Sequence, residues 1–308
     1  MDLVILSKFI AAAIAAGTPI LYAALGEILT ERAGVLNLGL EGLMLVGGMA
    51  GFAAASTFMS PWAGLVAALL AGALLGLVFG FLTITLRANQ VVSGLALTTF
   101  GIGLSAFLGK SLLGRGLTSS FKDYSIPILS DIPFFGVALF QHDALVYLSF
   151  ILVIVFWYLI YRTHAGLHMR SVGENPRAAD TLGVNVTRQR YVYTILGGAL
   201  VALGGAYLSV AYVPSWLENI TAGRGWIALA VVIFSGWNPI AALAGAYLFG
   251  GVNALSLYMQ AFGSKIPIHF MGMAPYFMTI IVLILATRGK KSGAAPAALG
   301  LPYDSEEK

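Results

Sequence analysis

Residues 42–86 read GLMLVGGMAGFAAASTFMSPWAGLVAALLAGALLGLVFGFLTITL and contain no Asp, Glu, Lys or Arg. A helix that crosses a bilayer needs about 20 consecutive, mostly apolar residues, so this stretch is long enough for two crossings. Its apolar residues follow one another continuously, whereas the strands of an outer-membrane β-barrel alternate apolar and polar residues. The stretch therefore predicts two successive transmembrane α-helices.

Further uncharged stretches extend this pattern over most of the chain. They cover residues 9–26, 88–109, 144–161, 191–217, 225–264 and 266–287. The composition agrees, because 59% of the 308 residues are hydrophobic and only 10% are charged, whereas soluble domains carry about 25% charged residues. A soluble globule is excluded, and we expect an all-α integral membrane protein, a polytopic helical bundle of eight to nine transmembrane helices.

The uncharged stretches also predict where the helices lie. We expect helices at residues 4–26, 36–58, 62–86, 89–109, 144–162, 191–213, 225–237, 240–261 and 269–287. The seventh is short because Asn238-Pro239 interrupts its apolar run, and proline disfavours helix at the residue before it. We therefore expect one transmembrane domain over residues 1–288. The tail, residues 289–308, is rich in Ala, Pro and acidic residues and is expected to be disordered and cytoplasmic.

The distribution of Lys and Arg predicts the orientation. If residues 163–190 form a cytoplasmic loop, alternation of the spans places eleven of the 17 Lys and Arg residues on the cytoplasmic side, as the positive-inside rule requires. Residues 110–142 then form an external loop, and the C-terminus lies in the cytoplasm. With nine crossings the N-terminus lies outside, whereas a re-entrant segment at residues 225–237 would place it on the other side. The net charge of +4 is thus a topology signal rather than an indication of nucleic-acid binding.

Glycines are spaced for close helix packing within the predicted spans. Gly72, Gly76 and Gly80 form a tandem GxxxG pattern on the third span. The sixth span carries Gly197, Gly198, Gly204 and Gly205. Such residues let helix backbones approach one another in lipid. We expect close packing within this chain, with contact to a second membrane subunit as the alternative.

Polar residues interrupt the apolar pattern between the first two spans, over residues 26–42, GEILTERAGVLNLGLEG. Glu27, Glu31 and Arg32 are expected to occupy a short cytoplasmic turn. Asn37 and Glu41 lie at or inside the second span, where polar groups usually face a partner or a cavity. The neighbouring glycines permit a broken helix whose unwound backbone lines a water-filled path.

A second polar group, Asn89-Gln90-Val91-Val92-Ser93, opens the fourth span. Its amide and hydroxyl groups suit a polar, uncharged ligand. Phe100 follows about three turns after Asn89. We predict a substrate pathway that is lined by the following residues: Asn37, Glu41, Asn89, Gln90, Ser93 and Phe100. The alternative is that these polar groups cap a helix and bond only to one another between helices.

Residues 166–183, GLHMRSVGENPRAADTLG, predict a short isolated helix in the cytoplasmic loop. Asn175 is a favourable N-cap, Pro176 fits the first helical position and Gly183 fits the C-terminal stop. This helix of about two turns is weakly amphipathic, so we favour docking into another protein over lying on lipid headgroups. The residues expected to dock are Gly173, Glu174, Asn175, Pro176, Arg177, Ala178, Ala179 and Asp180.

Other chemistries find no support in the sequence. Residues 103–111 resemble a phosphate-binding loop, but five residues rather than four separate the glycines and no strand precedes them. His164 and His168 have no nearby carboxylates to complete a metal site, and the chain has no cysteine for disulfides or cysteine-ligated metals. Without a GxSxG nucleophile motif or paired membrane Asp residues, no enzyme is indicated.

Four ordered motifs, within residues 26–44, 89–97, 166–184 and 223–230, resemble the permease subunits of bacterial ABC importers. The resemblance is to the simple-sugar and branched-chain amino acid group, most closely its nucleoside branch. It implies a fold like the type II ABC importers and a bacterial plasma (inner) membrane location. The segment around Glu174-Asn175-Pro176 would be the helix that couples to the ATPase.

The resemblance also implies partners and a substrate. The partners are a second homologous permease, a cytoplasmic ABC ATPase that binds ATP and Mg²⁺, an extracellular substrate-binding lipoprotein and membrane lipid; this chain would need no cofactor and would bind no nucleic acid. Purine nucleosides are the expected cargo. The alternatives are a simple-sugar permease and a stand-alone ion-coupled secondary transporter.

Overall fold

The computed structural model describes residues 3–261, 267–288 and 295–304, and they form the expected all-α bundle. The long helices are α1 (Leu3–Arg32), α2 (Leu40–Phe58), α3 (Pro61–Gly80), α4 (Gln90–Gly109), α6 (Ala144–Arg162), α9 (Val186–Tyr207), α11 (Pro239–Ala261) and α12 (Ile268–Arg288). The shorter ones are α5 (Phe135–Leu139), α7 (His164–Glu174), α8 (Pro176–Thr181) and α10 (Arg224–Phe234). π-Helical turns follow α3 (Phe81–Thr85) and α9 (Leu208–Tyr212), a 3₁₀ turn (Lys110–Leu112) follows α4, and β1 (Tyr124–Ser125) pairs antiparallel with β2 (Gln141–His142).

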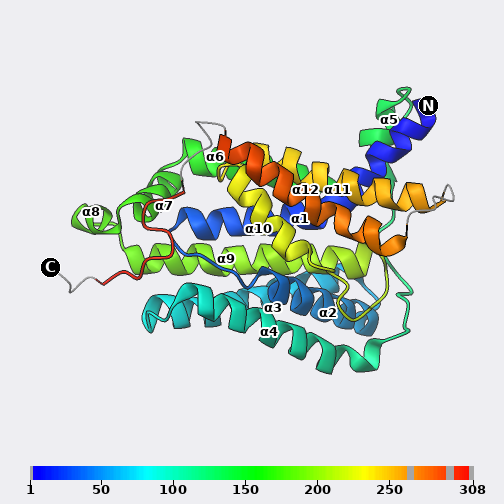
Figure 1. The fold of residues 1–308 in the computed structure, drawn as a ribbon. Helices are drawn as coiled ribbons and strands as arrows, with labels where there is room; N and C mark the ends of the chain where they lie inside the picture. The colour runs from blue at the N-terminus through cyan, green and yellow to red at the C-terminus, as the bar shows by residue number, and fades with distance from the viewer. Residues whose placement is uncertain (1–2, 262–266, 289–294, 305–308) are drawn as a thin grey trace.

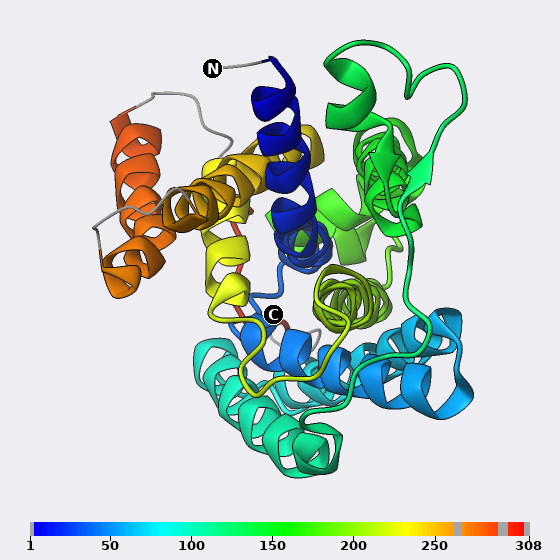
Figure 2. The ribbon, with the colours of Figure 1, turned by 90° about the vertical axis from the view of Figure 1, so that its right-hand side faces the viewer.

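The two central helices are α1 and α9, which pack against each other along the bundle. α2, α3 and α4 cover one side of this pair, while α10, α11 and α12 cover another (Figure 2). The N-terminus and α5 lie at one end of the bundle, and α7, α8 and the C-terminal residues lie at the opposite end (Figure 1). The loop expected to be external and the loop expected to be cytoplasmic therefore lie at opposite ends.

Helix length and hydropathy together identify the candidate spans. Within the described residues, seven helices are long and apolar enough to cross a membrane. Two further apolar stretches are too short to meet this criterion: α10 (Arg224–Phe234), and Phe270–Val282 within α12. The expectation of eight to nine transmembrane helices is thus not confirmed, although the interruption at Asn238-Pro239 is, because α10 ends before it and α11 begins at Pro239.

The glycines of the third and sixth spans pack within the chain. A Cβ atom on Gly198 of α9 would lie 2.6 Å from the carbonyl oxygen of Gly72 on α3. A Cβ atom on Gly76 would lie 2.8 Å from the Thr194 carbonyl oxygen. Real Cβ atoms do not approach this closely, so only glycine permits this contact between α3 and α9. These glycines therefore pack helices of this chain against each other, as expected.

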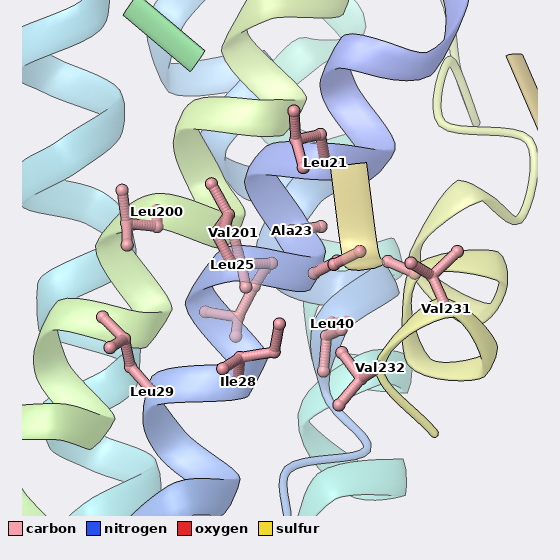
Figure 3. Close-up of a cluster of buried hydrophobic side chains, with 14 of the residues drawn as sticks. Leu21, Ala23, Leu25, Ile28, Leu29, Leu40, Leu200, Val201, Val231 and Val232 are labelled. Atoms are coloured by element: carbon pink, nitrogen blue, oxygen red, sulfur yellow. The ribbon is translucent and has the colours of Figure 1, made fainter. Parts of the chain in front are cut away.

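An apolar core joins α1 to its neighbours. Leu25 of α1 lies beside Val201 of α9, while Val231 and Val232 of α10 lie on the opposite side of α1 (Figure 3). These side chains are almost completely buried. The short helix α10 is therefore an integral part of the core rather than a surface element.

Helix α1 extends beyond the expected end at residue 26, which corrects the short-turn interpretation. It continues to Arg32, and Glu27 and Glu31 are 0% and 1% exposed. The sequence rule that ends a span at the first charged residue fails here because both carboxylates find donors inside the protein. Asn37 donates its backbone amide to Glu27, and the Trp237 indole donates to Glu31.

The tail also differs from expectation. Residues 295–304 pack against the bundle at the end formed by α7 and α8, and Ala298 is buried. Disorder is therefore the wrong expectation for these ten positions, since backbone hydrogen bonds and buried side chains hold them. The rest of the tail, residues 289–294 and 305–308, lies outside the described residues.

Candidate functional site

The chain between α1 and α2 is unwound over residues 33–39, and its backbone polar groups are held by side chains. Glu27 Oε1 accepts the amide of Asn37 at 3.0 Å, and Asn37 Oδ1 accepts the amide of Gly39 at 2.8 Å. Unpaired backbone groups are costly away from water, so these side chains stabilise the break. The second helix therefore begins at Leu40 rather than at residue 36, and a water-filled path along this unwound backbone remains a prediction.

Helix α4 fixes the same segment from the other side. Gln90 Oε1 accepts the amide of Leu36 at 2.7 Å, and the Thr98 hydroxyl donates to the Leu38 carbonyl oxygen at 3.0 Å. Gln90 is buried, and its Nε2 atom has no hydrogen-bond partner within the described residues. One donor near the unwound backbone is thus left for a group outside this chain or for water.

Glu41 is turned toward α10 rather than toward α4. Its Oε1 accepts the amide of Gly223 at 2.9 Å and the hydroxyl of Thr221, while its Oε2 accepts the amide of Gly225 at 2.8 Å. These donors lie at the N-terminus of α10, where a negative charge is favourable because the helix dipole is positive there. Glu41 therefore anchors one end of the short helix.

The opposite end of α10 is held by α1. Arg32 donates to the carbonyl oxygens of Gly236 and Trp237, at distances of 3.1–3.3 Å, and to the Tyr161 hydroxyl at 3.2 Å. The Trp237 indole donates to Glu31. A cation is favourable at this end because the exposed carbonyls make it negative. Charged groups thus hold α10 at both ends, in an apolar core that would otherwise leave those ends unsatisfied.

Apart from Glu41, the predicted pathway residues form two sets, one at the unwound segment and one on the exposed side of α4. Asn37 and Gln90 both bond within the unwound segment, and Ser93 lies one turn after Gln90 on the same helix, largely buried. Asn89 caps α4 by accepting the Val92 amide at 3.1 Å, which is the capping alternative. Phe100 is 55% exposed on the outer face of α4. A role in transport remains a prediction for all of them.

Sequence reasoning missed the partners that complete this region. Thr221, Tyr161 and Trp237 hold the charged residues, but none of them stands in a distinctive motif. The one usable signal was the Gly223-Arg224-Gly225 sequence at the start of an apolar run, which suits a helix start with close backbone contact. The carboxylate that binds there belongs to Glu41, which is distant in sequence.

The predicted cytoplasmic helix is present as α8. Asn175 Oδ1 accepts the amide of Ala178 at 3.0 Å, Pro176 opens the helix and Gly183 follows its end with φ of 83°. The predicted N-cap and stop are thus confirmed. Ala178, Arg177 and Asp180 are exposed, whereas Gly173 and Ala179 are buried within the chain.

The burial of Ala179 corrects one part of the docking expectation. Ala179 is 1% exposed and packs with Val172 of α7 and Val186 of α9. It therefore faces the bundle and is not free to contact another protein. Glu174, Asn175 and Ala178 remain on the exposed side of the segment.

The described residues contain no group of three or more His, Cys, Asp or Glu side chains that could hold a metal ion. The polar groups of the region instead bond to backbone amides and carbonyls, to the hydroxyls of Thr221 and Tyr161 and to the Trp237 indole. This arrangement stabilises the ends of α10 and the break between α1 and α2.

Comparisons with known proteins give the family. Residues 9–299 match the model of the branched-chain amino acid transport system permease component. A Bacillus subtilis guanosine ABC transporter permease is 37% identical over 98% of both chains, and a Lactococcus lactis nucleoside ABC transporter permease is 38% identical over 93% of both. A Haloferax volcanii protein named as a glucose ABC transporter permease is 40% identical over 96% of this chain and 97% of its own.

A solved structure supports the fold. It is described as a metal-chelate type ABC transporter in an inward-facing conformation, and it matches with a TM-score of 0.51 at 16% identity, over 92% of this chain and 84% of that one. The family match over residues 9–299 and the long apolar helices agree with one another. The chain therefore belongs to the branched-chain amino acid transport system permease family and is a multi-pass ABC transporter permease of the plasma membrane.

Proposed function

We propose that this chain forms the membrane pathway of an ATP-driven importer of nucleosides, with purine nucleosides as the first choice. The assignment of nucleosides as the cargo rests on the similarity, over nearly the full chain, to permeases named for guanosine and for nucleosides. A nucleoside is uncharged and carries many hydrogen-bonding groups. The amide-rich break beside α4 suits such a solute better than an ion.

A sugar is the second candidate, because the Haloferax volcanii relative is named for glucose and is equally similar. Sugars and nucleosides share hydroxyl groups that amides and hydroxyls recognise. They differ in the aromatic base, which needs an apolar or aromatic wall. The exposed Phe100 on α4 supports the nucleoside assignment.

The pathway is proposed to lie on the α4 side of the bundle, at an interface with a second permease. Asn89 and Phe100 are exposed there, and the unpartnered Gln90 Nε2 lies behind them at the unwound segment. A conduit requires weak, transient contacts so that its cargo can leave. A face that one chain leaves open and a second chain completes meets this requirement.

Transport energy is proposed to come from a cytoplasmic ATPase that docks on α8, with ATP and Mg²⁺ bound to that partner. An extracellular lipoprotein would deliver the nucleoside at the opposite end. The exposed side of α8, with Arg177, Ala178 and Asp180, supports the docking role. This chain would contribute binding surfaces and conformational change, and no catalytic residue or cofactor of its own.

Uptake by whole cells distinguishes the two cargoes. Deleting this chain in its native host is expected to abolish uptake of radiolabelled guanosine and to leave glucose uptake unchanged, and the restored gene should recover guanosine uptake. Excess inosine should compete with guanosine, whereas excess glucose should not. Loss of glucose uptake with normal guanosine uptake would instead identify a sugar permease.

Gln90→Leu is expected to reduce uptake several-fold. The substitution leaves the partly buried Leu36 amide without its acceptor, which costs up to about 1–3 kcal/mol, and removes the free Nε2 donor. Gln90→Glu keeps an acceptor for Leu36 but loses the donor, so it separates the two roles. Uptake should be divided by the amount of chain in the membrane. If both variants transport at the wild-type rate, Gln90 has no part in the pathway.

A further inference from the structure

The C-terminal segment 295–304 bonds to two cytoplasmic elements that lie far apart in sequence. The Ala298 amide donates to the Gly173 carbonyl oxygen of α7 at 2.9 Å. The Gly300 amide donates to the Gly34 carbonyl oxygen, in the break between α1 and α2, at 3.3 Å. Ala297 adds a bond to Glu174 Oε2 at 3.3 Å. The segment thus connects the end of α7 with the unwound chain that holds Asn37.

The same segment covers a buried cation. Arg190 of α9 is 1% exposed, and its Nη1 donates to the Leu301 carbonyl oxygen at 3.0 Å. Its guanidinium carbon lies 6.0 Å from the centre of the Tyr303 ring, which is within range for a cation–π contact. The Nε and Nη2 atoms have no partner within the described residues. Leu301 and Tyr303 therefore supply much of what offsets the cost of burying this charge.

Tyr303 also reaches the inner face of α8. It packs against the apolar cluster of Val172, Ala179 and Val186, which joins α7, α8 and α9. The next residue, Asp304, forms an ion pair with Arg87, just before α4 begins. The ten residues consequently touch α7, α8, α9, the α1–α2 break and the approach to α4.

We propose that residues 295–304 act as a strap that positions α8 and transmits its movement to the α1–α2 break, with Tyr303 and Arg190 as positioning residues. The inference rests on the proposed docking of an ATPase on α8. A helix of six residues is too short to be stable on its own, so its position depends on what packs beneath it. Tyr303 packs there, and the bonds to Gly173 and Gly34 connect α7 to the break through one continuous stretch of backbone.

The test uses the whole transporter, purified from its native host through a tag on a partner subunit and reconstituted in liposomes. The quantity measured is the number of guanosine molecules imported per ATP hydrolysed. Tyr303→Ala is expected to assemble normally and to hydrolyse ATP, but to lower this ratio about fivefold or more, the lower end of the range for coupling between sites. Tyr303→Phe should restore the ratio, because it keeps the ring over Arg190 and the cluster.

One control variant and one charge-reversal pair complete the test. Leu301→Ala shortens an exposed side chain but keeps the backbone carbonyl that Arg190 binds, so it should leave the ratio unchanged. Arg87→Glu and Asp304→Arg should each lower the ratio, and the double variant should recover part of it, since the ion pair is rebuilt with reversed charges.

The outcomes separate the strap from the function on which it rests. A wild-type ratio in Tyr303→Ala and in a chain truncated after residue 294 would overturn the strap. A loss of assembled complex in Tyr303→Ala, with an unchanged ratio in what remains, would also overturn it, because the role would then be structural only. If the wild-type complex imports no guanosine with ATP, the proposed function fails and the inference fails with it.

Discussion

Glu41→Leu is expected to lower uptake about tenfold or more, because each buried donor that loses its acceptor costs about 1–3 kcal/mol. Three donors lose theirs together: the Thr221 hydroxyl and the amides of Gly223 and Gly225. The leucine side chain also places apolar atoms where the N-terminus of α10 presents positive partial charge. Both effects act on a helix that forms part of the core, so the membrane content of the chain should fall as well. Uptake and membrane content are measured in the same cells.

Two variants make the result specific. Glu41→Gln keeps one acceptor oxygen but directs an NH₂ group at a donor, so an intermediate loss is expected. Glu218→Leu makes the same change at an exposed glutamate in the loop that precedes α10 and should behave as wild type. Wild-type uptake in Glu41→Leu would contradict the anchoring of α10 by this carboxylate.

Ala178→Trp is expected to uncouple transport while leaving the chain folded. The Ala178 side chain is exposed on α8, so an indole there can extend away from the bundle, where it would push a docked ATPase away from the helix. Overfilling a packed contact costs about 1–3 kcal/mol, which corresponds to roughly a tenfold loss of ATPase affinity. Co-purification of the ATPase with the tagged permease and uptake should fall together.

Ala178→Ser and Ala179→Trp are the controls for this prediction. Serine is almost as small as alanine and should retain ATPase binding. Tryptophan at Ala179 enters the buried cluster with Val172 and Val186, so it should reduce folded chain in the membrane as well as uptake. If Ala178→Trp co-purifies with normal amounts of ATPase and transports normally, α8 is not the docking helix.

Local signals allowed the best predictions from the sequence. The start and end of α8 follow from Asn175, Pro176 and Gly183, each of which acts within its own turn. The predicted helix at 144–162 has the bounds of α6, where Asp143 caps the first turn. Caps and prolines act over a few residues, so one sequence contains all of the information they need.

Contacts between distant residues could not be predicted in this way. Hydropathy treats Glu27 and Glu31 as solvated charges, yet their donors come from the α1–α2 break and from Trp237. Composition indicated a disordered tail, yet segment 295–304 is ordered by Gly34, Gly173 and Arg190. In each case a polar group is satisfied by a residue that only the fold brings near.

Only part of the candidate site could be predicted, because contacts between distant residues decide the rest. Asn37 and Gln90 each accept a backbone amide of the unwound segment. Glu41 was grouped with them because it is close in sequence, but as the second residue of α2 its carboxylate bonds to the N-terminus of α10. Residue type located the polar region, and the direction of each side chain was decided by packing.

The decisive measurement is ATP-driven movement of guanosine across the membrane of proteoliposomes that contain the purified transporter and its lipoprotein. The ATPase side faces the outer solution, where ATP is supplied, and guanosine and the lipoprotein are enclosed in the lumen. We expect guanosine to pass from the lumen to the outer solution only with hydrolysable ATP, and not with a non-hydrolysable analogue. The lipid-matched control omits the ATPase. Guanosine movement driven by a proton or sodium gradient, in vesicles that hold this chain without an ATPase, would contradict the account and identify a secondary transporter.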